Sequence, residues 1–276
     1  MFLDTVILVL QEILEAALII SVLLALTWQF RQFWPGHFTL GHSWILASML
    51  IGFIGSWIFA NYLPVITLWF DYVGLEIVNA VIQILIITCL LSLSYCLNKD
   101  RLLKFPWLNH FVAICITLIV ALGIIREVSE IIIFGLGILS QPENFSPVIL
   151  GSLIALGIGI SSGLILFFLL TNLKEPWSLR ICMLLLALYA GNMASQACLE
   201  LIQADWLPYT PELWNSSFII PEYSVTGQLL YALIGYEANP SVLQAAFYCG
   251  AVLLIILSPL FRLSWKPAPN QKLITN

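Results

Sequence analysis

The sequence predicts an all-α polytopic membrane protein with seven transmembrane helices, arranged as two inverted three-helix repeats plus a seventh helix. Three observations lead to this prediction. The chain has 276 residues, of which 61% are apolar and only 9% charged, whereas soluble domains average about 25% charged residues. Its apolar runs reach the roughly 20 residues that cross a bilayer. Acidic motifs of one spacing recur in its two halves.

The spans are expected to be helices because a backbone in lipid must satisfy its own hydrogen bonds, and because the runs lack the alternation of barrel strands. They cover 5–29, 44–63, 73–96, 109–139, 148–171, 180–203 and 242–262. The first is interpreted as a retained span, since Asp4 and no basic residue precedes its apolar core. The fourth is the longest and contains Gly135 and Gly137, so we expect it to be tilted, kinked or broken.

The whole chain is predicted to form one membrane domain. Its parts are a first repeat over 1–98, a second repeat over 107–203, an outer loop over 204–241 and a seventh helix over 242–263. In the two repeats, the first spans run in opposite directions across the membrane. Inverted repeats with a binding site near the midplane are a common transporter architecture.

The basic residues predict the orientation. Nine of the ten follow odd-numbered spans: Arg31, Lys99, Arg101, Lys104, Lys174, Arg180, Arg262, Lys266 and Lys272. The loops after the even-numbered spans contain no Lys or Arg and carry Asp71, Glu143, Asp205, Glu212, Glu222 and Glu237. The positive-inside rule therefore predicts an N-terminus outside and a cytoplasmic C-terminus. The acidic stretch from Asp205 to Glu237 either concentrates cations or docks a partner, or it is simply a solvated outer loop.

Two pairs of carboxylates fall inside predicted spans. Glu12 and Glu15 are three residues apart, and so are Glu127 and Glu130, next to Arg126. On a helix this spacing places both members of a pair on one face. At 1.5 Å per residue, Glu12 and Glu15 lie roughly 10–16 Å below the outer surface, and Glu130 lies roughly 15 Å from the outer end of the fourth span.

Charges at this depth need compensation, because each costs at least about 2.5–3.5 kcal/mol on insertion scales. Arg126, protonation of one or two glutamates, or a bound multivalent cation could each supply it. A purely structural alternative is an ion pair between Arg126 and Glu130 at i and i+4, but it leaves the other three glutamates unexplained. Ionisable groups inside a membrane indicate function by default.

The residue types near the motifs indicate a hard cation. Neither 9–20 nor 124–134 contains His, Cys or Met, which disfavours soft copper sites and imidazole-rich zinc sites. Four carboxylates and one guanidinium sum to −3, which matches a trivalent ion electrostatically. A metal site formed by the four glutamates therefore follows as a hypothesis.

The third span of each repeat is also polar inside the membrane. The residues are Glu76, Asn79 and Gln83 in the first repeat, and Asn192, Gln196 and Glu200 in the second. Spacings of three and four keep each set on one helical face. They form either a secondary polar pathway or interhelical hydrogen bonds that hold the bundle together.

The segment from Arg126 to Glu130 matches the R-E-x-x-E signature of the high-affinity, oxidase-dependent iron permease family. The stretches 191–192 and 201–208 resemble the end of that family's sixth span, and 227–241 resembles the segment that enters its seventh. The resemblance covers nearly the whole chain. One departure is Gln11, where the family has a second arginine. Gln11 donates hydrogen bonds but cannot compensate charge, which leaves transport rate, ion preference and activity open.

The resemblance implies a permease of the inner (plasma) membrane that imports Fe(III), formed by a partner oxidase on the outer face. In relatives this partner is a multicopper oxidase, or periplasmic cupredoxin-like and haem-peroxidase components. Iron is then the substrate, Glu12, Glu15, Glu127 and Glu130 its ligands, and Arg126 and Gln11 the charge-compensating positions.

The resemblance gives no reason to expect a permanently bound cofactor or a nucleic-acid partner. An enzyme is disfavoured, because no nucleophile–base set or metalloprotease motif is present. Two alternatives stay open: a carrier for another cation such as Pb(II), Mn(II) or Fe(II), and a non-transporting membrane subunit of the same fold.

Overall fold

The computed structural model describes residues 2–33, 43–96, 107–139, 145–174, 177–221 and 223–258. Within these ranges the regular structure is helical, apart from an isolated bridge between Glu212 and Ser241. Six helices are long and apolar enough to cross a membrane, as expected of a polytopic membrane protein. They are α1 (Phe2–Phe33), α2 (Ser43–Ile66), α3 (Gly74–Cys96), α5 (Trp107–Leu139), α6 (Phe145–Asn172) and α7 (Trp177–Gln203).

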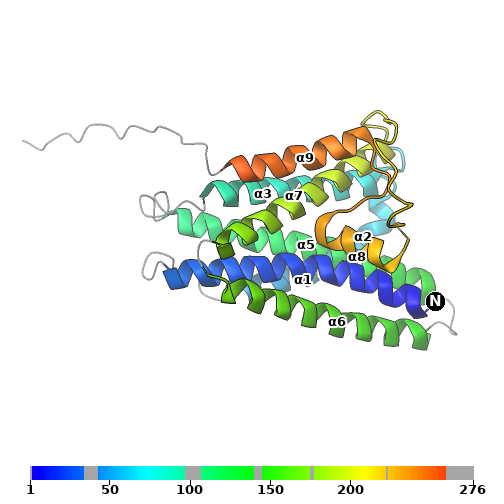
Figure 1. Cartoon of the computed structure of the whole chain (residues 1–276). Coiled ribbons are helices and arrows are strands. Elements are labelled where there is room, and N and C mark those ends of the chain that lie inside the picture. Colours follow the sequence, from blue (N-terminus) through cyan, green and yellow to red (C-terminus); the bar gives the residue numbers. More distant parts are fainter. Residues whose placement is uncertain are drawn as a thin grey trace, which may run out of the picture.

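The long helices lie side by side and alternate in direction (Figure 1). The chain's N-terminal end, the turn between α2 and α3, and the segment after α7 lie at one end of the bundle. Arg31, Lys174 and Arg180 are exposed at the opposite end, and Asp71 and Asp205 are exposed at the first. The described residues thus separate positive from negative charge along the bundle. The predicted basic residues within 97–106 and 259–276 lie outside the described residues.

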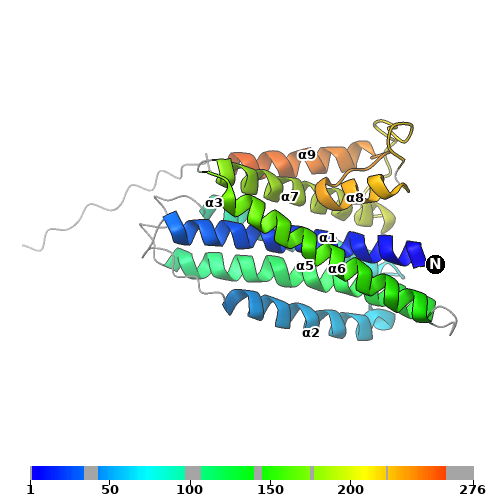
Figure 2. The same cartoon turned by 60° about the horizontal axis from the view of Figure 1, so that its bottom comes forward.

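Small residues allow close packing in two helix pairs, α1 with α6 and α2 with α5. Gly159 of α6 faces Ile13 of α1, and Ser21 of α1 donates a hydrogen bond to the Gly163 carbonyl over 2.8 Å. Figure 2 shows α6 crossing α1 at an angle while α2 lies along α5. In that second pair, Gly52 faces Ile124, and Ser56 donates to the Ile124 carbonyl over 3.1 Å. Close backbone approach through small residues is a general way of packing helices in lipid.

The centre of the bundle contrasts with its periphery. α7 is the most enclosed long helix, whereas α2 and α6 are the most exposed. Large side chains fully buried in the core include Leu23, Ile86, Leu90, Ile116, Leu186 and Met193. The exposed faces of α2 and α6 carry large apolar residues such as Leu50, Trp57, Ile165 and Phe168. Such faces suit contact with hydrocarbon rather than with water.

The predicted fourth span forms one continuous helix, α5, rather than a broken one. The predicted seventh span corresponds to α9 (Val242–Leu257), which has 16 residues and packs against α7 and α3. A capping box starts α9. The Ser241 hydroxyl accepts from the backbone N–H of Gln244, and the side-chain oxygen of Gln244 accepts from the backbone N–H of Ser241. The part of this span predicted beyond residue 258 lies outside the described residues.

The stretch predicted as an outer loop, 204–241, contains a helix. This helix, α8 (Val225–Ile234), begins at Ser224, whose side chain accepts from the Gly227 amide. It ends at Gly235, which adopts a left-handed conformation with φ of 68° that favours glycine. α8 packs against α1 and α7, and Gly235 lies directly against Asn192. The capping residues on both sides of an apolar run were the signal for this helix in the sequence.

Candidate metal centre

The two acidic motifs meet in the interior, where α1 packs against α5. Glu12, Glu15, Arg126 and Glu127 are all buried, and Glu15 is completely inaccessible. Glu130 differs, because 39% of its side chain is exposed. The helical spacing explains why each pair shares a face, but the contact between the pairs is a consequence of packing.

Arg126 contacts three of the four glutamates. Its Nη1 lies 3.2 Å from Glu15 Oε2 and 3.0 Å from Glu127 Oε1. Its Nε lies 3.4 Å from Glu130 Oε1. The intrahelical pair that offered a purely structural explanation is therefore present, but it is one part of a larger cluster that spans two helices. A guanidinium suits this role because it presents five donors in a fixed fork.

Glu12 has no basic partner among the described residues, although it lies in the same cluster. Its Oε2 is buried and makes no hydrogen bond to any described residue, and the same holds for Glu15 Oε1 and Glu127 Oε2. Buried carboxylate oxygens normally have a donor or a cation beside them. These three unsatisfied oxygens therefore mark a place where a positively charged ligand would be stabilised.

Three of the predicted ligands have the geometry of a cation site. One carboxylate oxygen from each of Glu12, Glu127 and Glu130 lies within 4.8 Å of the others. Across the described part of the chain, this is the one such group formed by His, Cys, Asp or Glu. Oxygen-only donor sets suit hard cations. Glu15, the fourth predicted ligand, is not a member of this trio, although it shares Arg126 with Glu127 and Glu130.

Gln11 is half-buried and its side chain makes no hydrogen bond with the described residues. It therefore does not take over the role of the arginine that the family pattern would place there. With all carboxylates ionised, the cluster of four glutamates and Arg126 has a formal charge of −3.

The polar residues of the third spans also meet. Asn79 of α3 donates to Glu200 of α7 over 3.4 Å, and Gln83 donates to Gln196 over 3.3 Å. Gln196 in turn donates to Asn192 over 3.0 Å. The first two bonds join α3 to α7, as the interhelical alternative expects, whereas the third lies within α7.

Glu76 and Glu200 are the acidic members of this polar face. Glu76 is half-buried, with one unpartnered carboxylate oxygen. Glu200 interacts electrostatically with Glu130 and Arg126, so the polar face of α3 and α7 continues towards the carboxylate cluster.

Residues of α7 that the sequence analysis did not single out also border the cluster. Met193 accepts a long hydrogen bond of 3.8 Å from Arg126 Nη1, and the buried Tyr189 hydroxyl makes no hydrogen bond within the described part of the chain. Extending the polar face of Asn192 and Gln196 back by one turn reaches Tyr189, so helical periodicity was an available signal.

Glu237 is another residue whose position the sequence did not predict. Its carboxylate accepts from Ser195 over 2.8 Å and from Gln244 over 2.7 Å. It thus ties the segment after α8 to α7 and α9, although the sequence analysis placed it only among acidic loop residues.

Comparisons with protein-family models, with curated proteins and with solved structures each find no match to this chain.

Proposed function

We propose that the protein is a membrane permease that imports iron, as Fe(III) generated by a partner oxidase, through the buried carboxylate cluster. The observation that carries the proposal is the convergence of Glu12, Glu127 and Glu130, whose ligand oxygens lie within 4.8 Å of one another between two apolar helices. The unpartnered oxygens in the same place supply the negative charge that a hard cation requires. The resemblance around Arg126 narrows the cation to iron.

The packing of the bundle supports two inverted repeats as the architecture of this permease. The first helix of each half packs most extensively against the second helix of the other half, as α1 with α6 and α5 with α2. The third helices, α3 and α7, pack against each other. A pseudo-twofold axis in the membrane plane relates such exchanged pairs. Movement of one half against the other around the fixed cluster would then give alternating access.

We place the acidic end of the bundle outside, with the C-terminus in the cytoplasm and α9 as the seventh span. Glu130 is the most exposed member of the trio, and exposed acids such as Asp71 and Asp205 at that end would attract cations towards it. A reporter fused after Asn276 should be active only as a cytoplasmic fusion. Activity of a periplasm-specific reporter at that position would contradict this orientation.

The partner in this scheme is an oxidase or a periplasmic iron-handling protein at the acidic face. A hard carboxylate site binds Fe(III) once the partner has oxidised Fe(II). The chain itself performs no oxidation in this scheme. We propose that it is not an enzyme and that the iron ion is its only inorganic ligand, bound transiently as substrate.

A carrier for a different cation is the second candidate, and a non-transporting subunit the third. Glu12 has no basic partner among the described residues, and position 11 is Gln where the family pattern has Arg. This missing charge supports both alternatives, because it would change ion preference or abolish transport. Uptake competition between Fe(III), Fe(II), Mn(II) and Pb(II) separates the carriers. Binding of a partner without any uptake would favour the subunit.

The central experiment measures binding of radioactive Fe(III), supplied as a weak chelate, to the full chain in lipid nanodiscs. Glu12→Gln, Glu127→Gln and Glu130→Gln should each weaken binding roughly tenfold or more, which corresponds to about 1.4 kcal/mol. Glu212→Gln is the matched control, because this acid is exposed and lies far along the chain from the cluster. Wild-type affinity in both Glu12→Gln and Glu127→Gln would refute the site.

A further inference from the structure

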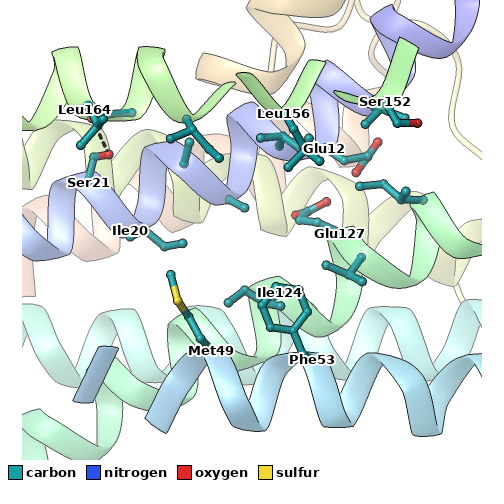
Figure 3. Close-up of a pocket in the computed structure, with 18 of the residues that line it drawn as sticks. Glu12, Ile20, Ser21, Met49, Phe53, Ile124, Glu127, Ser152, Leu156 and Leu164 are labelled. Carbon is teal, nitrogen blue, oxygen red and sulfur yellow. Dashed lines mark hydrogen bonds between the residues drawn. The ribbon is translucent and has the colours of Figure 1, made fainter. Parts of the chain in front are cut away.

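A large cavity adjoins the carboxylate cluster on the side away from α7. Its volume is about 610 Å³, and α1, α2, α5 and α6 form its walls (Figure 3). This volume lies within the range of about 300–1,000 Å³ typical of small-molecule sites. A single metal ion among three carboxylates needs far less space, so the proposed permease function does not account for the cavity.

The walls of the cavity are apolar except at a few points. Met49, Phe53, Ile124 and Leu156 illustrate the apolar majority, and Ser21 and Ser152 are the two hydroxyl residues. The charged residues in the wall are Glu12 and Glu127, and Figure 3 shows both among the side chains that surround the space. None of the described Lys, Arg or His residues lines it. The cavity therefore combines a large apolar surface with negative charge at one place.

The two carboxylates keep unused bonding capacity. Glu12 and Glu127 are only 4% and 2% exposed, and one oxygen of each is buried without a hydrogen bond. Arg126 forms no ion pair with Glu12, because its contacts are with Glu15, Glu130 and the other oxygen of Glu127. An uncharged occupant such as an acyl chain would leave both oxygens unpaired in an apolar space, which is costly.

We propose that this cavity binds a lipophilic organic cation, an ammonium or phosphonium with apolar substituents. Its charge pairs with Glu12 and Glu127, and its apolar body fills the space between the α1–α6 and α2–α5 pairs. Phe53 and Phe167 add aromatic surface, which attracts organic cations. The outer walls belong to α2 and α6, the peripheral helices. A ligand dissolved in the bilayer would therefore reach the site from the side of these two helices.

The same two carboxylates would then serve a metal ion and an organic cation in turn. The two ligands should compete, with the organic cation acting as an inhibitor or as an alternative substrate. This proposal goes beyond iron transport and does not depend on it, because the binding of an organic cation can be measured with no metal present.

The test uses the full chain in nanodiscs, with chelator and without added metal, and tetraphenylphosphonium as the probe. Glu12→Gln and Glu127→Gln should each weaken probe binding roughly tenfold or more. Leu156→Trp, which fills the cavity, should do the same. Its matched control is Leu153→Trp on the same helix, since Leu153 is exposed and does not line the cavity. Triphenylphosphine oxide, an uncharged analogue, should bind at least tenfold more weakly than the cation.

Thermal unfolding of each variant distinguishes lost binding from lost folding. Equal binding of the charged and uncharged probes, or full binding by folded Leu156→Trp, would overturn the proposal and assign the cavity to bilayer lipid. Iron binding measured on the same samples keeps the two proposals separate. If the wild type binds iron but not tetraphenylphosphonium, only this inference fails. If it binds tetraphenylphosphonium but not iron, only the iron proposal fails.

Discussion

The acidic pairs on α1 and α5 have the same spacing but differ in how their charge is balanced. On α5, both Glu127 and Glu130 contact Arg126 of their own helix, at 3.0 and 3.4 Å. On α1, Glu15 reaches across to the same guanidinium at 3.2 Å, and Glu12 reaches no basic group among the described residues. One arginine thus serves two helices. The acidic pair on α1, which has no arginine on its own helix, must therefore obtain positive charge from a ligand or from protons as well.

The two pairs also differ in accessibility. Glu15 is completely buried, whereas 39% of the Glu130 side chain is exposed. The α5 pair therefore offers the accessible ligand, and the α1 pair supplies the enclosed side of the cluster.

Replacing Arg126 with Met should have the largest effect, because it removes the one cation that both helices share. Breaking a buried ion pair by deleting one partner costs about 3–5 kcal/mol. The yield of folded protein and the free energy of unfolding in detergent should both fall. Arg126→Met combined with Glu15→Gln should recover part of the loss, since it also removes one of the stranded carboxylates. Wild-type stability in the single variant would show that the guanidinium does not hold the helices together.

The two glutamates of α1 should respond oppositely to the same change. Glu15→Gln should lower the free energy of unfolding by about 1–3 kcal/mol, because Arg126 loses a charged partner. Glu12→Gln should leave stability unchanged or raise it, since Glu12 has no cation beside it, yet it should weaken iron binding more. Unfolding and iron binding are measured on both variants in parallel. A larger stability loss in Glu12→Gln would contradict the division of roles.

Gln11→Arg should restore the missing charge and make the two halves alike. Protons and metal compete for the same carboxylates, so wild-type iron binding should strengthen as pH rises over the mildly acidic range. An arginine at position 11 is four residues before Glu15, as Arg126 is before Glu130, and should flatten this dependence. Iron binding at several pH values compares the two proteins. Identical profiles would mean that position 11 does not face the cluster.

The smallest effect is expected at the polar contact between α3 and α7, away from the acidic pairs. Gln83→Leu should lower the free energy of unfolding by about 1–3 kcal/mol or less, because it leaves the side-chain oxygen of Gln196 without its donor. The double variant Gln83→Leu with Gln196→Leu should be no less stable than the single variant, since it leaves the Asn192 side-chain oxygen without its donor in place of the Gln196 oxygen. Iron binding should be unchanged in both. A loss of binding in the double variant would instead support the secondary polar pathway.

The class of the protein and the positions of its long helices could be predicted from the sequence. The predicted span 73–96 corresponds to α3 at Gly74–Cys96, and 180–203 corresponds to α7 at Trp177–Gln203. Both follow from local physics, because bilayer thickness sets the length of an apolar run and lipid forces its backbone into a helix. Helical periodicity also placed Glu12 beside Glu15 and Glu127 beside Glu130.

Only the tertiary structure decided which of these groups meet. The sharing of Arg126 between helices, the grouping of three carboxylates without Glu15 and the cavity beside Glu12 depend on how α1, α2, α5 and α6 are rotated and spaced. That arrangement results from close contacts at glycines such as Gly52 and Gly159. Spacing along one helix determines neighbours on that helix alone, because contacts between helices depend on the shapes of all the surfaces that pack together.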